Sequence, residues 1–135
     1  MANNLLPYVE VEPTVPAKAC VIWMHGLGDS GHGFAPIAPE LKLPEDMAVR
    51  FVFPHAPERP VTINGGMRMR AWYDIKSLDF NSRADIDGAK ESAAQIEALI
   101  QQQVDKGIPH EKIVLAGFSQ GGVIALHLAT TYGHK

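Results

Sequence analysis

The chain has 135 residues, 46% hydrophobic and 20% charged, a composition typical of a single globular domain. Its formal net charge is −3 and its Lys and Arg residues are scattered, which argues against a nucleic-acid-binding protein. No apolar run reaches the roughly 20 residues of a membrane span, and the start lacks a signal-peptide pattern. A lone cysteine excludes an internal disulfide, so we expect a cytoplasmic protein.

The first half of the chain predicts two strands. The continuous apolar run Ala19–Met24 is typical of a strand buried on both faces of a parallel sheet. A glycine-rich segment ends this strand, and a short helix is predicted from Phe34 to Leu41. The second strand lies within residues 47–57 and stops at Pro54. We expect residues 55–84 to be irregular.

The strongest helix pattern follows, as one apolar stripe with steps of three and four residues. Ser82 and Asp85 give a start signal, and Gly107 and Pro109 predict the end. The stripe consists of Ile86, Ala89, Ala93, Ile96, Ile100 and Val104.

A third strand (residues 112–118) and a third helix (residues 119–133) complete the chain. Strands that alternate with helices predict an α/β fold with a doubly wound, mainly parallel sheet and helices on both faces. We expect one domain over residues 1–135. In such sheets ligands bind at the carboxyl ends of the strands, where both glycine-rich loops of this chain lie.

The junction between the third strand and third helix carries the pattern G-x-S-x-G, from Gly117 to Gly121. A sharp strand-to-helix turn holds the serine in strained backbone angles and leaves room only for glycine two residues on either side. Ser119 is therefore a candidate nucleophile, with the backbone N–H of Gln120 at the new helix N-terminus as an oxyanion donor. The alternative is a glycine turn that only permits tight packing.

A second loop, His25-Gly26-Leu27-Gly28, follows the first strand. Its glycines allow a backbone N–H, that of Leu27 foremost, to turn toward Ser119 as a second oxyanion donor. The alternatives are a plain turn or a phosphate-binding loop. Neither G-x-G-x-x-G nor GK[ST] is present, so a phosphate loop has little support.

Three segments and their order, "HGLGDSGHGF", "FVFPHAPERPVTINGGMRMRAWYDI" and "GIPHEKIVLAGFSQGG", resemble the carboxylesterase/acyl-protein thioesterase family of α/β-hydrolases, particularly bacterial carboxylesterases. The resemblance runs from about Ala17 to the end. It implies an α/β-hydrolase fold and a cofactor-independent serine hydrolase acting on esters or acyl thioesters, lysophospholipids and acylated proteins among them.

The resemblance also assigns roles to residues of this chain. Ser119 would be the nucleophile, and the N–H groups of Leu27 and Gln120 the oxyanion hole. Trp72 would border the acyl-binding cleft, although ordinary core packing explains it equally well. The supporting positions of the two loops are His25, Gly26, Gly28, Gly117, Phe118 and Gly121.

The partners that would activate Ser119 are not visible downstream of it, where an α/β-hydrolase has an Asp or Glu and then a His. Residues 120–135 contain no acidic residue, and their histidines are His127, eight positions along the helix, and His134. Of the upstream histidines His25, His32 and His55, the first is best placed but belongs to the oxyanion loop. We therefore expect a domain that is incomplete at its C-terminal side.

An incomplete domain would leave the edge of the third strand unpaired, and self-association through this edge is one consequence. Two other functions stay open. The chain could be a non-catalytic module that binds a ligand or partner, or another small α/β-hydrolase that acts on lactones or dipeptides. We expect no metal site, and Cys20, inside a strand, is expected to be buried and structural.

Overall fold

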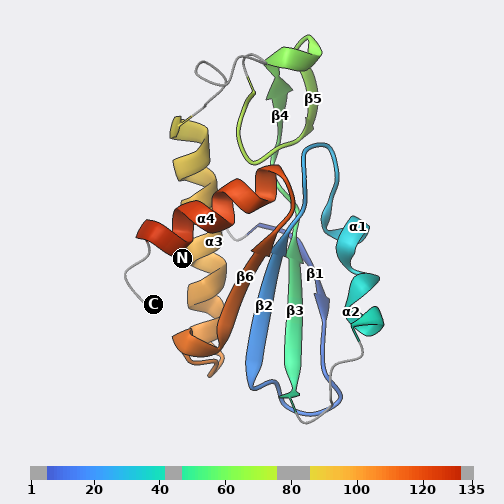
Figure 1. The fold of residues 1–135 in the computed structure, drawn as a ribbon, viewed down its shortest axis with the longest axis vertical. Helices are drawn as coiled ribbons and strands as arrows, with labels where there is room; N and C mark the ends of the chain where they lie inside the picture. The colour runs from blue at the N-terminus through green and yellow to red at the C-terminus, as the bar shows by residue number, and fades with distance from the viewer. Residues whose placement is uncertain (1–5, 42–46, 76–85, 132–135) are drawn as a thin grey trace.

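The computed structural model describes residues 6–41, 47–75 and 86–131. A four-stranded sheet has the order β1-β3-β2-β6, and a two-stranded hairpin, β4–β5, lies beyond the carboxyl ends of the parallel strands (Figure 1). The strands are β1 (Tyr8–Val11), β2 (Ala19–Met24), β3 (Val49–Pro54), β4 (Glu58–Val61), β5 (Met67–Arg70) and β6 (Ile113–Gly117). The helices are α1 (Gly31–Phe34), α2 (Ile37–Glu40), α3 (Ile86–Asp105) and α4 (Gln120–Thr131), with 3-10 turns η2 (Thr62–Asn64) and η3 (His110–Lys112).

The parallel part of the sheet is β2 between β3 and β6. Ala19 of β2 lies opposite Val49 of β3, and Cys20 lies opposite Ile113 of β6. These are the three predicted strands, and the mainly parallel α/β sheet is confirmed. β1 is an addition that the sequence did not predict. It pairs antiparallel with β3, and its half-buried residues carry little local strand pattern.

Side chains of the central strands alternate between two hydrophobic clusters, one on each face of the sheet. On β2, Cys20, Ile22 and Met24 join the larger cluster, to which α3 and α4 contribute. Val21 and Trp23 join the smaller cluster, which includes residues of the α1–α2 segment. Helical segments therefore cover both faces, as the sequence predicted.

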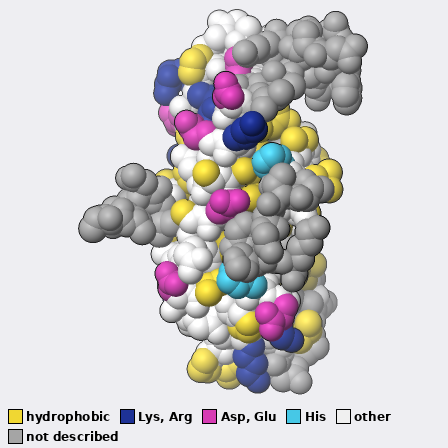
Figure 2. Space-filling model, turned by 90° about the vertical axis from the view of Figure 1, so that its left-hand side faces the viewer, with side chains coloured by type: hydrophobic (Ala, Val, Ile, Leu, Met, Phe, Trp, Pro, Cys, Tyr) yellow, Lys and Arg dark blue, Asp and Glu magenta, His cyan; other side chains and the backbone are white. Residues whose placement is uncertain are grey.

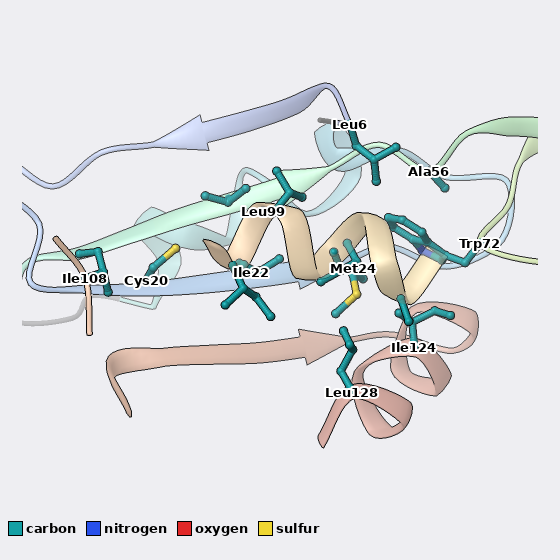
Figure 3. Packing of buried hydrophobic residues seen from close by; sticks show 14 residues of the cluster. Leu6, Cys20, Ile22, Met24, Ala56, Trp72, Leu99, Ile108, Ile124 and Leu128 are labelled. Carbon is teal, nitrogen blue, oxygen red and sulfur yellow. The ribbon is translucent and has the colours of Figure 1, made fainter. Parts of the chain in front are cut away.

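The larger cluster holds α3 and α4 against the sheet. Figure 3 shows Leu99 of α3 and Ile124 and Leu128 of α4 packing near the β2 side chains, with Trp72 toward the carboxyl end of the strand. Fully burying a Leu or Ile side chain contributes about 1.5–3 kcal/mol relative to exposure. The start of α4, which follows Ser119, is therefore anchored by the core.

Helix α3 confirms the predicted stripe, since Ala93, Ile96 and Ile100 are buried. Its start signal, Ser82 to Asp85, lies outside the described residues. The helix ends in a Schellman arrangement in which the Ile108 N–H donates to the Gln103 carbonyl (3.0 Å) and the Gly107 N–H donates to the Val104 carbonyl (2.9 Å). Gly107 adopts the left-handed conformation that this ending requires, with φ 100°.

Two predictions about the first half of the chain need correction. The helix predicted over Phe34–Leu41 is split into α1 and α2, because Pro36 interrupts it. Residues 55–75 are not irregular, since they contain the hairpin β4–β5, whose turn includes Gly65 and Gly66 at φ 70° and 80°. The rest of the segment expected to be irregular, residues 76–84, lies outside the described residues.

Within the described part of the chain, β6 pairs with β2 alone, so its other edge has no strand beside it. Exposed hydrophobic side chains gather on β6, the following turn and α4. They are Val114, Phe118, Val123 and Leu126, with exposed fractions of 47–69%. Figure 2 shows this side of the molecule, with hydrophobic side chains among acidic and basic ones. None of the described helices is long and apolar enough to cross a membrane.

Candidate active site

The turn between β6 and α4 holds Ser119 in an unusual backbone conformation. Its φ is +55°, in the left-handed region that costs a residue with a Cβ atom roughly 1–2 kcal/mol. The turn is fixed on both sides, because the Phe118 N–H donates to the Met24 carbonyl (3.1 Å) and the Gly121 N–H donates to the Phe118 carbonyl (3.0 Å). Ser119 itself is exposed. The fold thus holds an accessible hydroxyl at the carboxyl end of the sheet.

The two glycines of the motif are required by space. A Cβ atom on Gly121 would collide with the backbone carbonyls of Met24 and His25, and one on Gly117 would collide with the backbone of Gly121. Helix α4 therefore begins in direct contact with the end of β2. This close approach brings the serine turn to the loop that follows β2.

That loop, His25 to Gly28, lies beside the serine turn. A Cβ atom on Gly26 would come within 3.2 Å of the Phe118 ring, so the two loops are in contact. The Asp29 N–H donates to the Gly26 carbonyl (3.2 Å), and the Gly28 N–H donates to the Arg70 carbonyl at the end of β5 (2.9 Å). Gly28 has φ 80°, a conformation suited to glycine.

The two predicted oxyanion donors, the N–H groups of Leu27 and Gln120, are alike in their hydrogen bonding. Within the described part of the chain, no hydrogen bond uses the backbone N–H of Leu27 or that of Gln120. The Gln120 N–H belongs to the first turn of α4, where the helix dipole places positive charge. The role of these two N–H groups as oxyanion donors stays a prediction.

The segment Trp72–Tyr73 joins both loops. The Trp72 indole N–H donates to the His25 carbonyl (2.8 Å), and the Trp72 backbone N–H donates to Oε1 of Gln120 (2.7 Å). The Ser92 hydroxyl of α3 donates to the Trp72 carbonyl. Trp72 is completely buried in the larger hydrophobic cluster. The structure therefore places it in the core below the loops, and its predicted contact with substrate stays a prediction.

A sequence profile of the phospholipase/carboxylesterase family matches residues 7–135. The chain belongs to this family. Acyl-protein thioesterase 1 of Yarrowia lipolytica is 45% identical over 126 residues, which cover 89% of this chain and 55% of that protein. Acyl-protein thioesterase 1 of Cryptococcus neoformans is 44% identical over 132 residues, which cover 93% of this chain and 54% of that protein.

Solved structures of α/β-hydrolases share the fold. Zea mays acyl-protein thioesterase 2 superimposes with a TM-score of 0.78 at 34% identity, over 92% of this chain and 51% of that one. Arabidopsis thaliana SOBER1 gives a TM-score of 0.76 at 35% identity, over 82% of this chain and 54% of that one. A Bacillus cereus carboxylesterase, 17% identical, shows the same fold, with a TM-score of 0.73 over 98% of this chain and 57% of that one. The chain spans about half the length of these phospholipase/carboxylesterase relatives.

In this family member His25 uses both ring nitrogens. The Ala56 N–H donates to Nε2 (3.0 Å), so Nδ1 carries the proton and donates to the Gly26 carbonyl (2.7 Å). Burial lowers the pKa of His25, which keeps the ring neutral. His25 therefore braces the loop, and neither nitrogen is available to accept a proton from Ser119.

Two of the other histidines, His32 and His55, lie side by side. The Gly31 N–H donates to Nδ1 of His55 (3.0 Å), and the rings of His55 and His32 lie 5.1 Å apart. Burial, with a contribution from the charge of Arg70, lowers the pKa of His55. His127 is half-buried on α4, and His134 lies outside the described residues. His110 lies at the amino end of β6, away from the serine turn.

The predicted structural role of Cys20 agrees with its surroundings. The side chain is buried at the start of β2, and burial raises the pKa of the thiol to about 12. Among the described residues, no group of His, Cys, Asp and Glu side chains could hold a metal ion.

Sequence reasoning missed two polar contacts of this site. Gln120 was expected to contribute only its backbone N–H. Its side chain is buried and hydrogen-bonds to the backbone of residues 72 and 73. Ser92 was also missed. A serine beside the apolar stripe of α3 was the available signal, because a buried hydroxyl needs a partner.

Proposed function

We propose that Ser119 is the nucleophile of a hydrolase that cleaves carboxylic esters or acyl thioesters through an acyl-enzyme. The observation that carries this proposal is an exposed serine at φ +55° between a strand and a helix, in a turn that contacts a glycine loop. Such strain is retained where the surrounding structure enforces it, which is typical of functional sites.

The chemistry proceeds in two steps. The Ser119 oxygen attacks the carbonyl carbon, its proton passes to a general base, and the carbonyl oxygen becomes an oxyanion. The Leu27 and Gln120 N–H groups stabilise this oxyanion. It then collapses and expels the alcohol or thiol, which takes the proton from the base. Water, deprotonated by the same base, attacks the ester on Ser119; the Ser119 oxygen leaves and takes that proton back from the base, and the carboxylic acid is released.

We place the general base and its orienting acid outside residues 1–135. Both ring nitrogens of His25 are occupied. His127 lies eight residues along α4, roughly 12 Å from Ser119 at 1.5 Å per residue, which is too far for a hydrogen bond. The matches cover only 55% and 54% of the Yarrowia and Cryptococcus relatives, so both groups have room in the unmatched part of such a protein.

Acyl thioesters are the preferred substrate class of this proposal. The Yarrowia and Cryptococcus relatives are named acyl-protein thioesterases, at 45% and 44% identity. The family name adds carboxylic esters and phospholipids, so small esters and lysophospholipids are included. The proposal involves no metal or organic cofactor, because a serine hydrolase needs none.

The test uses the protein as its gene encodes it, with whatever follows Lys135. Hydrolysis of short p-nitrophenyl esters, acyl thioesters, lactones and dipeptides is compared in wild type and Ser119→Ala. We expect ester or thioester turnover that Ser119→Ala abolishes while the protein stays folded. Turnover that survives the substitution, or fastest turnover of lactones or dipeptides, would refute the proposal.

A further inference from the structure

The side chain of Gln120 bridges the start of α4 to the segment that carries Trp72. Its Oε1 accepts the Trp72 backbone N–H at 2.7 Å, and its Nε2 donates to the Tyr73 carbonyl at 2.8 Å. We call these two hydrogen bonds the Gln120 bridge. Gln120 is 3% exposed, so water does not compete strongly for either contact.

The chemistry of the bridge is specific to a carboxamide. One partner is a donor and the other an acceptor, so the side chain must accept at one atom and donate at the other. A carboxylate would turn an oxygen toward the Tyr73 carbonyl, and an apolar side chain would remove both hydrogen bonds. Helix propensity alone therefore does not explain glutamine at this position.

Trp72 extends the bridge to the other loop. Its indole N–H donates to the His25 carbonyl (2.8 Å), and Nδ1 of His25 donates to the Gly26 carbonyl (2.7 Å). A continuous chain of buried hydrogen bonds thus runs from Gln120 through Trp72 to the residue before Leu27. The rings of Trp72 and His25 also pack with centroids 5.3 Å apart.

We propose that the Gln120 bridge and Trp72 together fix the separation of the two oxyanion N–H donors, those of Leu27 and Gln120. Gln120 thereby acts twice: its backbone N–H binds the oxyanion, and its side chain positions that N–H. Trp72 is a positioning residue that acts from the core. This inference rests on the proposed function, since it concerns the same oxyanion site.

Rates follow from this geometry. Losing one oxyanion donor costs about 10²–10³ in kcat, and a small misplacement of catalytic groups costs part of that factor. Substitutions at the Gln120 side chain keep the backbone N–H and disturb only its position. We therefore expect a fall in kcat of about 10-fold or more, a KM within about twofold of wild type, and the same fall for every acyl length.

The experiment uses the protein as its gene encodes it. The rate of fluorophosphonate labelling of Ser119 and the kcat and KM for p-nitrophenyl acetate, butyrate and octanoate are measured in three variants. Gln120→Met removes the bridge at similar volume, Gln120→Glu keeps only the acceptor, and Trp72→Phe removes the indole donor. If Gln120→Met does not fold, the other two carry the test.

The matched control is Gln103→Met. Gln103 is another buried glutamine on a helix, and its Oε1 accepts from Arg50 (2.8 Å). It lies near the end of α3, at the opposite end of the sheet from the serine turn (Figure 1). Its substitution should lower stability and leave kcat within about twofold. A folded Gln120→Met with wild-type kcat would overturn the proposal, as would equal kcat losses in Gln103→Met and Gln120→Met.

Further outcomes distinguish a failure of the positioning role from a failure of the proposed function. If Trp72→Phe raises KM by an amount that grows with acyl length, Trp72 contacts substrate and its positioning role is wrong. If the fluorophosphonate does not label Ser119 in wild type, the proposed function fails and this inference fails with it. If wild type is labelled and all three variants are labelled at the wild-type rate, the positioning role of the Gln120 bridge is wrong and the proposed function stands.

Discussion

Gly121 at the start of α4 lies against the backbone carbonyl of Met24 at the end of β2, with no room for a Cβ atom between them. The contact joins the serine turn to the strand that leads into the loop from His25 to Gly28. Because Met24 belongs to the central sheet, its carbonyl cannot move aside without disturbing the pairing of β2 with β6. The geometry of the candidate site therefore depends on this glycine.

Gly121→Ala should lower the free energy of unfolding by about 2 kcal/mol or more, because the added methyl group overpacks a backbone contact. The control is Gly122→Ala, where the added Cβ meets its nearest atom, the Gly117 carbonyl oxygen, at 3.4 Å. Alanine favours the helix there by about 1 kcal/mol. Urea unfolding measures the free energy of unfolding of both variants. Equal values for Gly121→Ala and Gly122→Ala would contradict the predicted clash.

The left-handed conformation of Ser119 predicts a difference between two inactive variants. Ser119→Gly removes the steric cost of φ +55°, whereas Ser119→Ala retains it. We expect the glycine variant to be about 1 kcal/mol more stable than the alanine variant, although neither should hydrolyse ester. Chemical denaturation of the pair measures the difference. A less stable glycine variant would show that the strain is absent in solution.

Stability should decrease in mild acid because of His55. The ordinary pKa of a histidine is 6.5, and burial, helped by the charge of Arg70, lowers the pKa of His55 in the folded chain. The fold thus favours the neutral ring. Its contribution is complete above pH 6.5 and is lost as the pH falls through 6.5 toward the folded pKa.

His55→Asn tests this pH dependence, because Oδ1 of asparagine can accept the Gly31 N–H that now bonds Nδ1 (3.0 Å). The free energy of unfolding is measured at pH 7.5 and 5.5. The loss on acidification should be smaller in the variant than in wild type, with a residual loss from His25, whose pKa burial also lowers. An unchanged loss would exclude His55 as a source.

The Cys20 thiol should be inert in the folded protein, because it is buried and its pKa is raised to about 12. Treatment with iodoacetamide at pH 8 should leave the mass unchanged under native conditions and alkylate the protein in urea. Intact mass spectrometry distinguishes the two states. Rapid alkylation of the native protein would mean that the start of β2 opens to solvent.

Local patterns predicted the elements that carry their own signal. The buried run Ala19–Met24, the stripe along α3 and the motif around Ser119 each follow from residues that are neighbours in sequence, and each prediction of structure is confirmed. β1 was missed because its pairing with β3 joins residues about 40 positions apart. The hairpin β4–β5 had a signal in Asn64-Gly65-Gly66, a turn sequence that Pro60 in β4 obscured.

The sequence predicted the two loops of the site, but it did not predict the hydrogen bonds that connect them. Gln120 and Trp72 are 48 residues apart, and no periodicity or spacing connects a helix-start glutamine with a backbone amide in a distant segment. The unpaired edge of β6, as seen in the described part of the chain, was expected because the strand that carries the serine is central in the α/β-hydrolase arrangement and only one helix follows it here. Self-association through that edge stays a proposal, which the concentration dependence of the mass in solution would test.

The central claim is that Ser119 is an activated nucleophile, and labelling with a fluorophosphonate tests it most directly. The protein as its gene encodes it is treated with the reagent, its intact mass is recorded, and the adduct is mapped by peptide sequencing, with Ser119→Ala as the control. We predict a single adduct on Ser119 that is absent from the control. An unlabelled folded protein, or an adduct that persists in Ser119→Ala, would contradict the account.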